Sequence, residues 1–288
     1  MQKSISSRPA VLGFLCLALL GLAPGRADEF IDDEAIKAAF ETDLSRRFKA
    51  GGLVTGAAFA EQLRQASASA QIPEIAPPEA SPESAFSRAR AATLVLGHLF
   101  LCDQCDKHHA SLSGGVLLSA DGLALTNYHV LDNRQAIVFG ARTADGRVFP
   151  IQEILAASKD DDLALVRLRD ARDLPFVGLG DDPAGGDEVF VVSHPDGHFY
   201  TLTRGHLSRK FLAAETHVPR LQITADFAKG SSGCGIFDLA GNLAGLATAT
   251  SSIHYRESEG KGENLQMVLK VGVPASSIRK LLGVAGKP

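Results

Sequence analysis

From residue 90 onward, short apolar segments alternate with turns of glycine, aspartate and asparagine, and this alternation limits the fold more than any other feature. The segments are rich in Val, Leu, Ile and Phe, which favour strands. The expected strands are 115–119, 123–126, 135–139, 162–168, 188–192, 199–203, 221–224, 236–237 and 243–247. Strands at this spacing predict an all-β barrel or sandwich. A final helix is expected at 276–282, after Val273-Pro274.

The segment before residue 85 has a different pattern. Apolar residues recur at helical spacing from Ile31 to Phe48, until Gly51-Gly52 interrupts them, and residues 58–68 suit a second helix. Residues 72–84 are rich in proline and read as a linker. We therefore expect a separable element at 28–85, which covers the main domain or links protomers into a homo-oligomer. Its deletion is predicted to leave a folded core while activity or mass in solution changes.

Residues 1–27 have the pattern of a secretory signal. Lys3 and Arg8 precede a short apolar run at 11–22, and small residues end at Ala27. The run is too short to span a bilayer well, so we expect an exported protein, periplasmic or secreted, without a stable membrane anchor. The net charge of −4 and the lack of a basic cluster argue against nucleic-acid binding.

A glycine-dense loop at Gly230-Ser-Ser-Gly-Cys-Gly235 is the first candidate for chemistry. Glycine lets the backbone turn sharply and approach a ligand closely. A serine in such a loop can present its hydroxyl together with backbone N–H groups. Acyl transfer needs both, a nucleophile and donors for the oxyanion. Such loops are also ordinary turns, so the motif needs support from elsewhere.

Two further stretches provide that support. His129 follows the strand at 123–126 and is expected at the rim of the sheet, and Asp162 begins the apolar strand at 162–168. Singly, each has a structural explanation, as a strand-end histidine and a charged turn. With Ser232 they follow the chain order His, Asp, Ser of a known catalytic triad.

At these residues the sequence resembles the trypsin-like serine endopeptidases, and in style it is closest to bacterial secreted and HtrA-like members. The matching stretches are LTNYHVL around His129, DDLALVRL around Asp162 and GSSGCGIFD around Ser232, with VSHPDG at 192–197 and VGVPASSIRKLL near the end. The likeness covers roughly residues 90–283. It implies two six-stranded antiparallel β-barrels with the site between them, and a protease domain at 86–288.

The resemblance implies a role for each matching residue. Ser232 is the nucleophile, His129 the base and then the acid, and Asp162 the orienting carboxylate. The N–H groups of Gly230 and Ser232 form the oxyanion hole. Thr248, Ala249 and Thr250 form the strand that pairs with a protein or peptide substrate, and no cofactor is implied. The alternative is a protease-fold protein without turnover that serves as a binding or chaperone module.

Some positions depart from the family pattern. Cys234 and Gly235 replace the usual glycine and proline after Gly233, which affects packing behind the nucleophile more than chemistry. No activation sequence of the trypsin type precedes the barrel, and no PDZ-like stretch follows residue 283. A full HtrA chaperone-protease architecture is therefore not expected.

Substrate preference depends on Asp226, six residues before Ser232. In trypsin-like enzymes this spacing lies near the floor of the pocket for the side chain before the scissile bond. A buried carboxylate there would favour Arg or Lys. Thr250, where many relatives have glycine, would narrow the pocket mouth. We expect small or aliphatic residues ahead of basic ones.

Cys102 and Cys105, with His98, His108 and His109 nearby, could form a metal cluster. In an exported protein a disulfide or two buried thiols is favoured, so we expect no metal site and no stoichiometric zinc. A thiol or metal redox protein is a third hypothesis, which lacks the usual βαβ context. Cys234 completes an odd number of cysteines once Cys16 leaves with the signal. The remaining histidines are expected on the surface or in turns: His194, His198, His206, His217 and His254.

Overall fold

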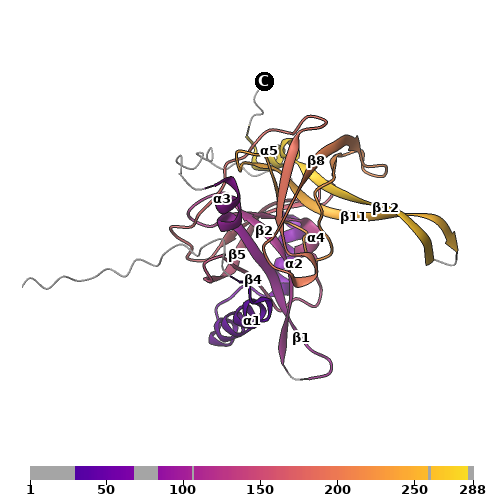
Figure 1. Cartoon of the computed structure of the whole chain (residues 1–288). Coiled ribbons are helices and arrows are strands. Elements are labelled where there is room, and N and C mark those ends of the chain that lie inside the picture. Colours follow the sequence, from indigo (N-terminus) through magenta and orange to yellow (C-terminus); the bar gives the residue numbers. More distant parts are fainter. Residues whose placement is uncertain (1–29, 68–83, 106, 259–260, 285–288) are drawn as a thin grey trace, which may run out of the picture.

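The computed structural model describes residues 30–67, 84–105, 107–258 and 261–284, and its centre is a pair of closed six-stranded barrels (Figure 1). The signal predicted at 1–27 and most of the proline-rich stretch at 72–84 lie outside the described residues. The helices of the described chain are α1 (Asp33–Ala50), α2 (Gly56–Gln65), α3 (Ala85–Ala92), α4 (Tyr128–Leu131) and α5 (Ala275–Leu282), with a 3₁₀ turn η1 (Pro195–Gly197).

The first barrel is antiparallel and closes when β1 pairs with both β2 and β4. Its strands are β1 (Thr93–Leu101), β2 (His108–Leu117), β3 (Leu123–Thr126), β4 (Val138–Arg142), β5 (Val148–Ser158) and β6 (Leu163–Leu168). Apolar side chains of these strands fill the interior, together with residues from the helices and from the second barrel. The barrel therefore has no open sheet edge among its own strands.

The second barrel closes through the pairing of β7 with β10. Its strands are β7 (Glu188–Ser193), β8 (Thr201–Leu212), β9 (Pro219–Ile223), β10 (Gly235–Phe237), β11 (Leu243–Ser258) and β12 (Lys261–Pro274). The outer parts of β11 and β12 continue beyond the barrel as a long two-stranded ribbon (Figure 1). The prediction of two six-stranded antiparallel barrels is confirmed.

Every expected strand overlaps an observed one, and β3 has the expected bounds. The hairpin of 236–237 with 243–247 is confirmed by the pairing of β10 with β11, and α5 confirms the C-terminal helix. No strand was expected at the positions of β1 or β5. In β1 seven successive residues are buried, so the strand lacks the alternation that marks a half-buried strand.

The N-terminal helices form where the sequence predicts them. The Asp32 side chain caps α1 by accepting from the Ala35 N–H at 2.9 Å, and Gly51 ends the helix at a φ of 85°. Thr55 caps α2 in the same way. Both helices pack on the first barrel, where α1 contacts β2, β4 and β5, and α2 contacts β5.

The structure agrees with the expectation that this segment covers the main domain, and its burial argues against a separable element. Phe40 and Leu44 of α1 are fully buried in a cluster with Leu99, Val138 and Val148. Phe59 of α2 is also fully buried, and its ring meets Phe139 of β4 at 5.5 Å in an edge-to-face contact. These side chains pack both helices against the first barrel, and we expect the helices and the barrel to unfold together. An oligomer formed through them stays a prediction.

Within the described ranges, every helix is too short or too polar to cross a bilayer.

Candidate active site

His129 lies between the two barrels because β3 ends three residues before it. Asn127 precedes the short helix α4 at the N-cap position without a side-chain capping bond, and this turn carries His129 to the rim of the first barrel. The strand end is anchored by Thr126, whose hydroxyl donates to the Gly114 carbonyl at 2.8 Å. Half of the His129 side chain is exposed, so the imidazole can meet both a substrate and Ser232.

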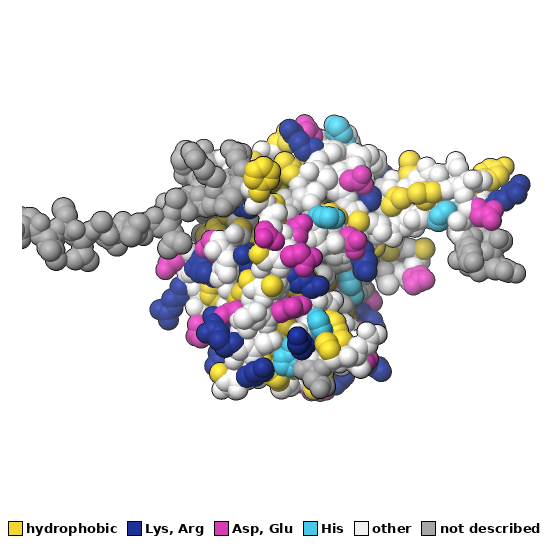
Figure 2. Space-filling view, turned by 60° about the horizontal axis from the view of Figure 1, so that its bottom comes forward, with side chains coloured by type: hydrophobic (Ala, Val, Ile, Leu, Met, Phe, Trp, Pro, Cys, Tyr) yellow, Lys and Arg dark blue, Asp and Glu magenta, His cyan; other side chains and the backbone are white. Residues whose placement is uncertain are grey.

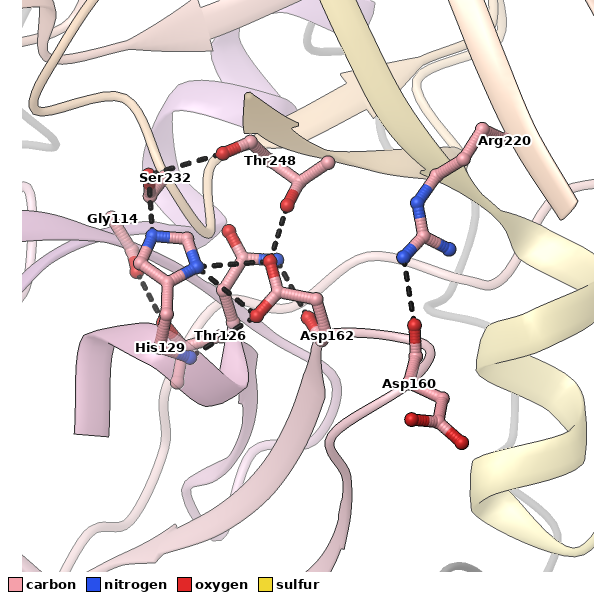
Figure 3. A network of polar contacts seen from close by, with 9 residues as sticks. Gly114, Thr126, His129, Asp160, Asp162, Arg220, Ser232 and Thr248 are labelled. Atoms are coloured by element: carbon pink, nitrogen blue, oxygen red, sulfur yellow. Dashed lines mark hydrogen bonds and ion pairs between the residues drawn. The ribbon is translucent and has the colours of Figure 1, made fainter. Parts of the chain in front are cut away.

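Asp162 faces His129 from the turn before β6 (Figure 3). Its φ of 59° is left-handed, a conformation that aspartate tolerates better than most residues. The Asp162 carboxylate oxygens lie 3.0 and 2.9 Å from His129 Nδ1, and one of them also accepts from the His129 backbone N–H at 3.1 Å. Asn127 Nδ2 donates to the Asp162 carbonyl at 2.8 Å and fixes the turn.

Ser232 completes the hydrogen-bonded chain from the second barrel. Its Oγ lies 2.9 Å from His129 Nε2, whereas the Thr248 carbonyl is farther away at 3.4 Å. Because a carboxylate only accepts, His129 Nδ1 carries the proton and Nε2 is left to accept from the hydroxyl. Ser232, His129 and Asp162 are thus brought together as the sequence predicts.

The loop around Ser232 is held against the first barrel by its backbone. The Gly114 N–H of β2 donates to the Ser232 carbonyl at 2.7 Å, and Gly233 N–H donates to the Ala247 carbonyl at 3.0 Å. A Cβ on Gly233, at a φ of 83°, would lie 2.3 Å from the Gly114 carbonyl oxygen. The glycine is therefore required by close approach of the two barrels.

Thr248 has a role that the sequence analysis missed. Its hydroxyl donates to Asp162 Oδ2, the same carboxylate oxygen that lies 2.9 Å from His129 Nδ1 (Figure 3). A register shift between Ala247 and Ala249 in the pairing of β11 with β12 leaves Thr248 unpaired there. Such a bulge re-aims a side chain, so the irregularity accounts for the contact with Asp162.

Replacing Thr248 with valine tests this contact, because valine keeps the shape and removes the hydroxyl. We expect kcat to fall by about 10-fold, since a hydrogen bond to a charged group contributes roughly 1.5–3 kcal/mol. Thr248→Ser, which keeps the hydroxyl, should retain most of the activity. Steady-state kinetics on one peptide substrate compare the variants, and equal losses in both would contradict the role of the hydroxyl.

Two backbone N–H groups are available for an oxyanion. Among the described residues, neither the Gly230 nor the Ser232 N–H has a protein acceptor. The Lys229 carbonyl accepts from the Asp196 N–H at 2.6 Å. Because C=O and N–H point in opposite directions in a trans peptide, the Gly230 N–H points away from η1. The loop geometry leaves both donors free to meet a substrate.

His194 supports this loop from behind, and its assignment to the surface is wrong. The side chain is buried, with Nδ1 accepting from Tyr200 N–H at 3.1 Å and Nε2 3.1 Å from the Leu94 carbonyl. Burial lowers the pKa of His194 to about 4, so the ring is neutral at pH 7. A Cβ at Gly230 would lie 2.6 Å from the His194 carbonyl oxygen, so residue 230 must be small.

Arg220 of β9 braces the turn that carries Asp162. Its guanidinium donates to the Asp160 carbonyl at 2.9 Å, which links the second barrel to the first (Figure 3). Burial lowers the pKa of Arg220, while the Asp162 and Asp161 carboxylates act in the opposite direction. The arginine therefore holds the backbone beside the triad without bonding to the catalytic carboxylate.

The strand expected to pair with substrate has a free edge. β11 pairs with β10 only as far as Leu246, while its other side pairs with β12 through Thr250. Ala249 and Thr250 are exposed. An extended peptide can add to such an edge by main-chain hydrogen bonds.

Asp226 is not the buried pocket carboxylate that a basic preference would need. Its side chain is 79% exposed and forms an ion pair with Lys270 at 2.9 Å. The Lys270 side chain is only 12% exposed, and its Nζ also donates to the Phe227 carbonyl at 2.5 Å. A paired carboxylate beside a lysine does not create a demand for a cationic substrate side chain.

Cys234 occupies the first position that departs from the family pattern. Its side chain is fully buried behind Ser232, and a Cβ on Gly114 would lie 2.1 Å from its Sγ. Burial raises the pKa of the Cys234 thiol, so it stays protonated and unreactive. The substitution is therefore accommodated by the glycine of β2, without reaching the nucleophile.

The cysteines of the β1–β2 turn are free thiols, and the side chain of one histidine lies close to both. The ligand atoms of Cys102, Cys105 and His109 all lie within 4.8 Å of one another. His98 is instead buried against Phe139. Of the three histidines near the cysteines in sequence, only His109 belongs to the cluster.

A groove borders the oxyanion donors on the side of α1. It is lined by the first turn of that helix, by Ala110–Leu112 of β2, by residues 196–199 and by Lys229 and Gly230. Asp33 of α1 accepts from the Phe199 N–H at 2.9 Å. The N-terminal helix therefore lines a groove that reaches Gly230, two residues before Ser232.

Comparisons with known proteins agree with this geometry. The family model for the trypsin-like peptidase domain matches residues 113–246. A probable periplasmic serine endoprotease DegP-like from Marinomonas sp. is 32% identical over 168 residues, 57% of this chain and 34% of that protein. The periplasmic serine endoprotease DegP of Escherichia coli K12 is 32% identical over 145 residues, covering 48% and 30% of the two chains.

Among solved structures, the HtrA-type protease AlgW with a tripeptide superposes with a TM-score of 0.53 at 28% identity, over 67% of this chain and 59% of that one. The chain spans about a third of the length of the curated relatives that it matches.

Proposed function

We propose that this chain is a serine endopeptidase of the trypsin-like, HtrA type, which cleaves proteins or peptides through an acyl-enzyme. The observation that carries the proposal is the unbroken hydrogen-bonded chain from Ser232 through His129 to Asp162. The relatives named periplasmic endoproteases support export to the periplasm.

In the proposed mechanism, Ser232 Oγ attacks the scissile carbonyl while His129 Nε2 takes its proton. Asp162 holds the imidazole in the required tautomer and stabilises its charged form. The oxyanion is met by the Gly230 and Ser232 N–H groups. His129 then gives its proton to the leaving amine, and water, activated by the same imidazole, hydrolyses the acyl-enzyme. The substrate backbone pairs with Thr248–Thr250.

The alternative, a binding or chaperone module without turnover, requires a defective site. In the described site all three members of the triad are present and hydrogen-bonded, and its two oxyanion donors have no protein acceptor. A fluorophosphonate probe distinguishes the two functions, because it reacts only with an activated serine. We expect one label per chain on Ser232, found by peptide mass spectrometry, and no label on His129→Ala. Unlabelled wild-type protein would favour the binding module.

We expect cleavage after small or aliphatic residues such as Val or Ala rather than after Arg or Lys. Lys270, largely buried beside Phe227, pairs with Asp226 and leaves no unpaired carboxylate there to attract a cationic side chain. In a peptide library, kcat/KM after Val or Ala should exceed that after Arg by at least about 10-fold. Asp226→Ser should leave the preference unchanged. Cleavage after Arg that disappears in Asp226→Ser would restore the pocket role of this carboxylate.

A further inference from the structure

The turn between β1 and β2 brings three metal-binding side chains to one point, far from the triad along the strand. The hairpin is in register up to the pair of Leu101 with His108, and the Cys102 N–H then donates to the Lys107 carbonyl at 3.2 Å. This pairing places Cys102 and Cys105 in the turn itself, while His109 opposes Phe100 on β1. The register, rather than the spacing in sequence, selects His109.

The three ligand atoms are close enough together for one metal ion to bind them with small side-chain adjustments. Cys105 Sγ lies 3.2 Å from His109 Nε2, and all three ligand atoms lie within 4.8 Å of one another. In a tetrahedral zinc site with bonds of about 2.3 Å to sulfur and 2.0 Å to nitrogen, neighbouring ligand atoms are roughly 3.5–3.8 Å apart. The Gln104 N–H, 3.4 Å from Cys102 Sγ, can donate to a thiolate and stabilise it as a ligand.

The neighbouring histidine is used differently. Successive side chains of a strand point to opposite faces. His108 points to α1, where its Nδ1 lies 3.2 Å from Ser45 Oγ and its ring packs edge-on to Phe48. His109 therefore points away from the helix, toward the cysteines. Figure 2 shows histidine side chains next to apolar and basic ones near the lower edge of that face.

We propose that Cys102, Cys105 and His109 bind one zinc ion, with the fourth position left to water or to a group from outside these residues. Two thiolates and an imidazole form a donor set that suits zinc. The chain from His109 to Gly114, which bonds to Ser232, spans roughly 17 Å at about 3.3–3.4 Å per residue. The ion would thus close the end of the hairpin and would not touch the substrate. This proposal reverses the sequence expectation of no zinc.

The test is metal binding by the purified full chain, reduced with a phosphine and stripped with a chelator. Zinc is titrated against a chromophoric chelator, and Co²⁺ is added separately to detect thiolate-to-metal charge transfer in the near ultraviolet. We expect one ion per chain and the charge-transfer band. Cys105→Ser and His109→Ala should each weaken zinc binding by at least about 100-fold. This factor is the upper end of the loss expected when a residue that only hydrogen-bonds to a metal ligand is removed.

His108→Ala is the matched control, because it removes an imidazole one residue away that faces α1. It should bind zinc as the wild type does. Circular dichroism and a thermal melt check that every variant is folded. Reduced wild-type protein that gives no charge-transfer band, or variants that bind zinc as tightly as wild type, would overturn the proposal. So would a Cys102–Cys105 disulfide that forms in the presence of saturating zinc.

Discussion

Replacing Ser232 with alanine is expected to lower kcat by at least about 10⁴-fold, while the protein keeps its fold. The hydroxyl oxygen is the only heavy atom removed, and it carries a hydrogen bond to His129 rather than a packing contact. His129→Ala should cost a similar factor. Because the two residues act as a unit, the double variant should be no worse than either single one.

Casein cleavage and peptide kinetics measure the loss, and circular dichroism shows that the fold is retained. Ser231→Ala is a useful neighbour control for substitution in the same loop: Ser231 is buried, and its Oγ has no partner within the described structure. Near-wild-type casein cleavage by Ser232→Ala would mean that another residue is the nucleophile.

The triad could be predicted from sequence because each member sits in a local pattern. His129 follows a short apolar strand, Asp162 precedes one, and Ser232 lies in a loop whose glycines are needed for close approach. These patterns depend on neighbours within a few residues. The sequence does not show the hydrogen bonds that join the three residues. That the residues meet was inferred from their chain order and from the family resemblance.

What could not be predicted depends on contacts between distant residues. Lys270 neutralises Asp226 from another strand, 44 positions later in the chain, so no local pattern marks Asp226 as paired and exposed. Thr248 reaches Asp162 only because β11 has a bulge, which a strand pattern does not reveal. His109 joins the cysteines through the register of the β1–β2 hairpin.

The N-terminal helices show that packing partners, too, cannot be predicted from a local sequence pattern. Helical spacing predicted α1 and α2, and the proline-rich stretch after them suggested a boundary. A helix pattern says which face is apolar but not what covers it. Here the first barrel covers both apolar faces, so the linker composition separates segments of sequence without separating folding units.

The last prediction follows from that packing. Phe59→Ala should lower the free energy of unfolding by about 3–5 kcal/mol, the cost of a cavity left by a large buried side chain. Phe59 is fully buried against Phe139, whereas Phe30, next to α1, is fully exposed. Phe30→Ala is therefore the matched control and should change stability by no more than about 0.5 kcal/mol. Urea unfolding in a Ser232→Ala background measures both without self-digestion.

Deleting residues 28–67 should have the larger effect, because it removes Phe40, Leu44, Phe59 and Leu63 together. At about 2–5 kcal/mol for each buried side chain, the loss is comparable with the whole stability of a typical domain, roughly 5–15 kcal/mol. We expect the truncated chain to lack a cooperative unfolding transition. It should also be inactive, because α1 lines the groove beside Gly230. A truncated chain that unfolds at the wild-type urea midpoint would show that the barrel is complete without the helices.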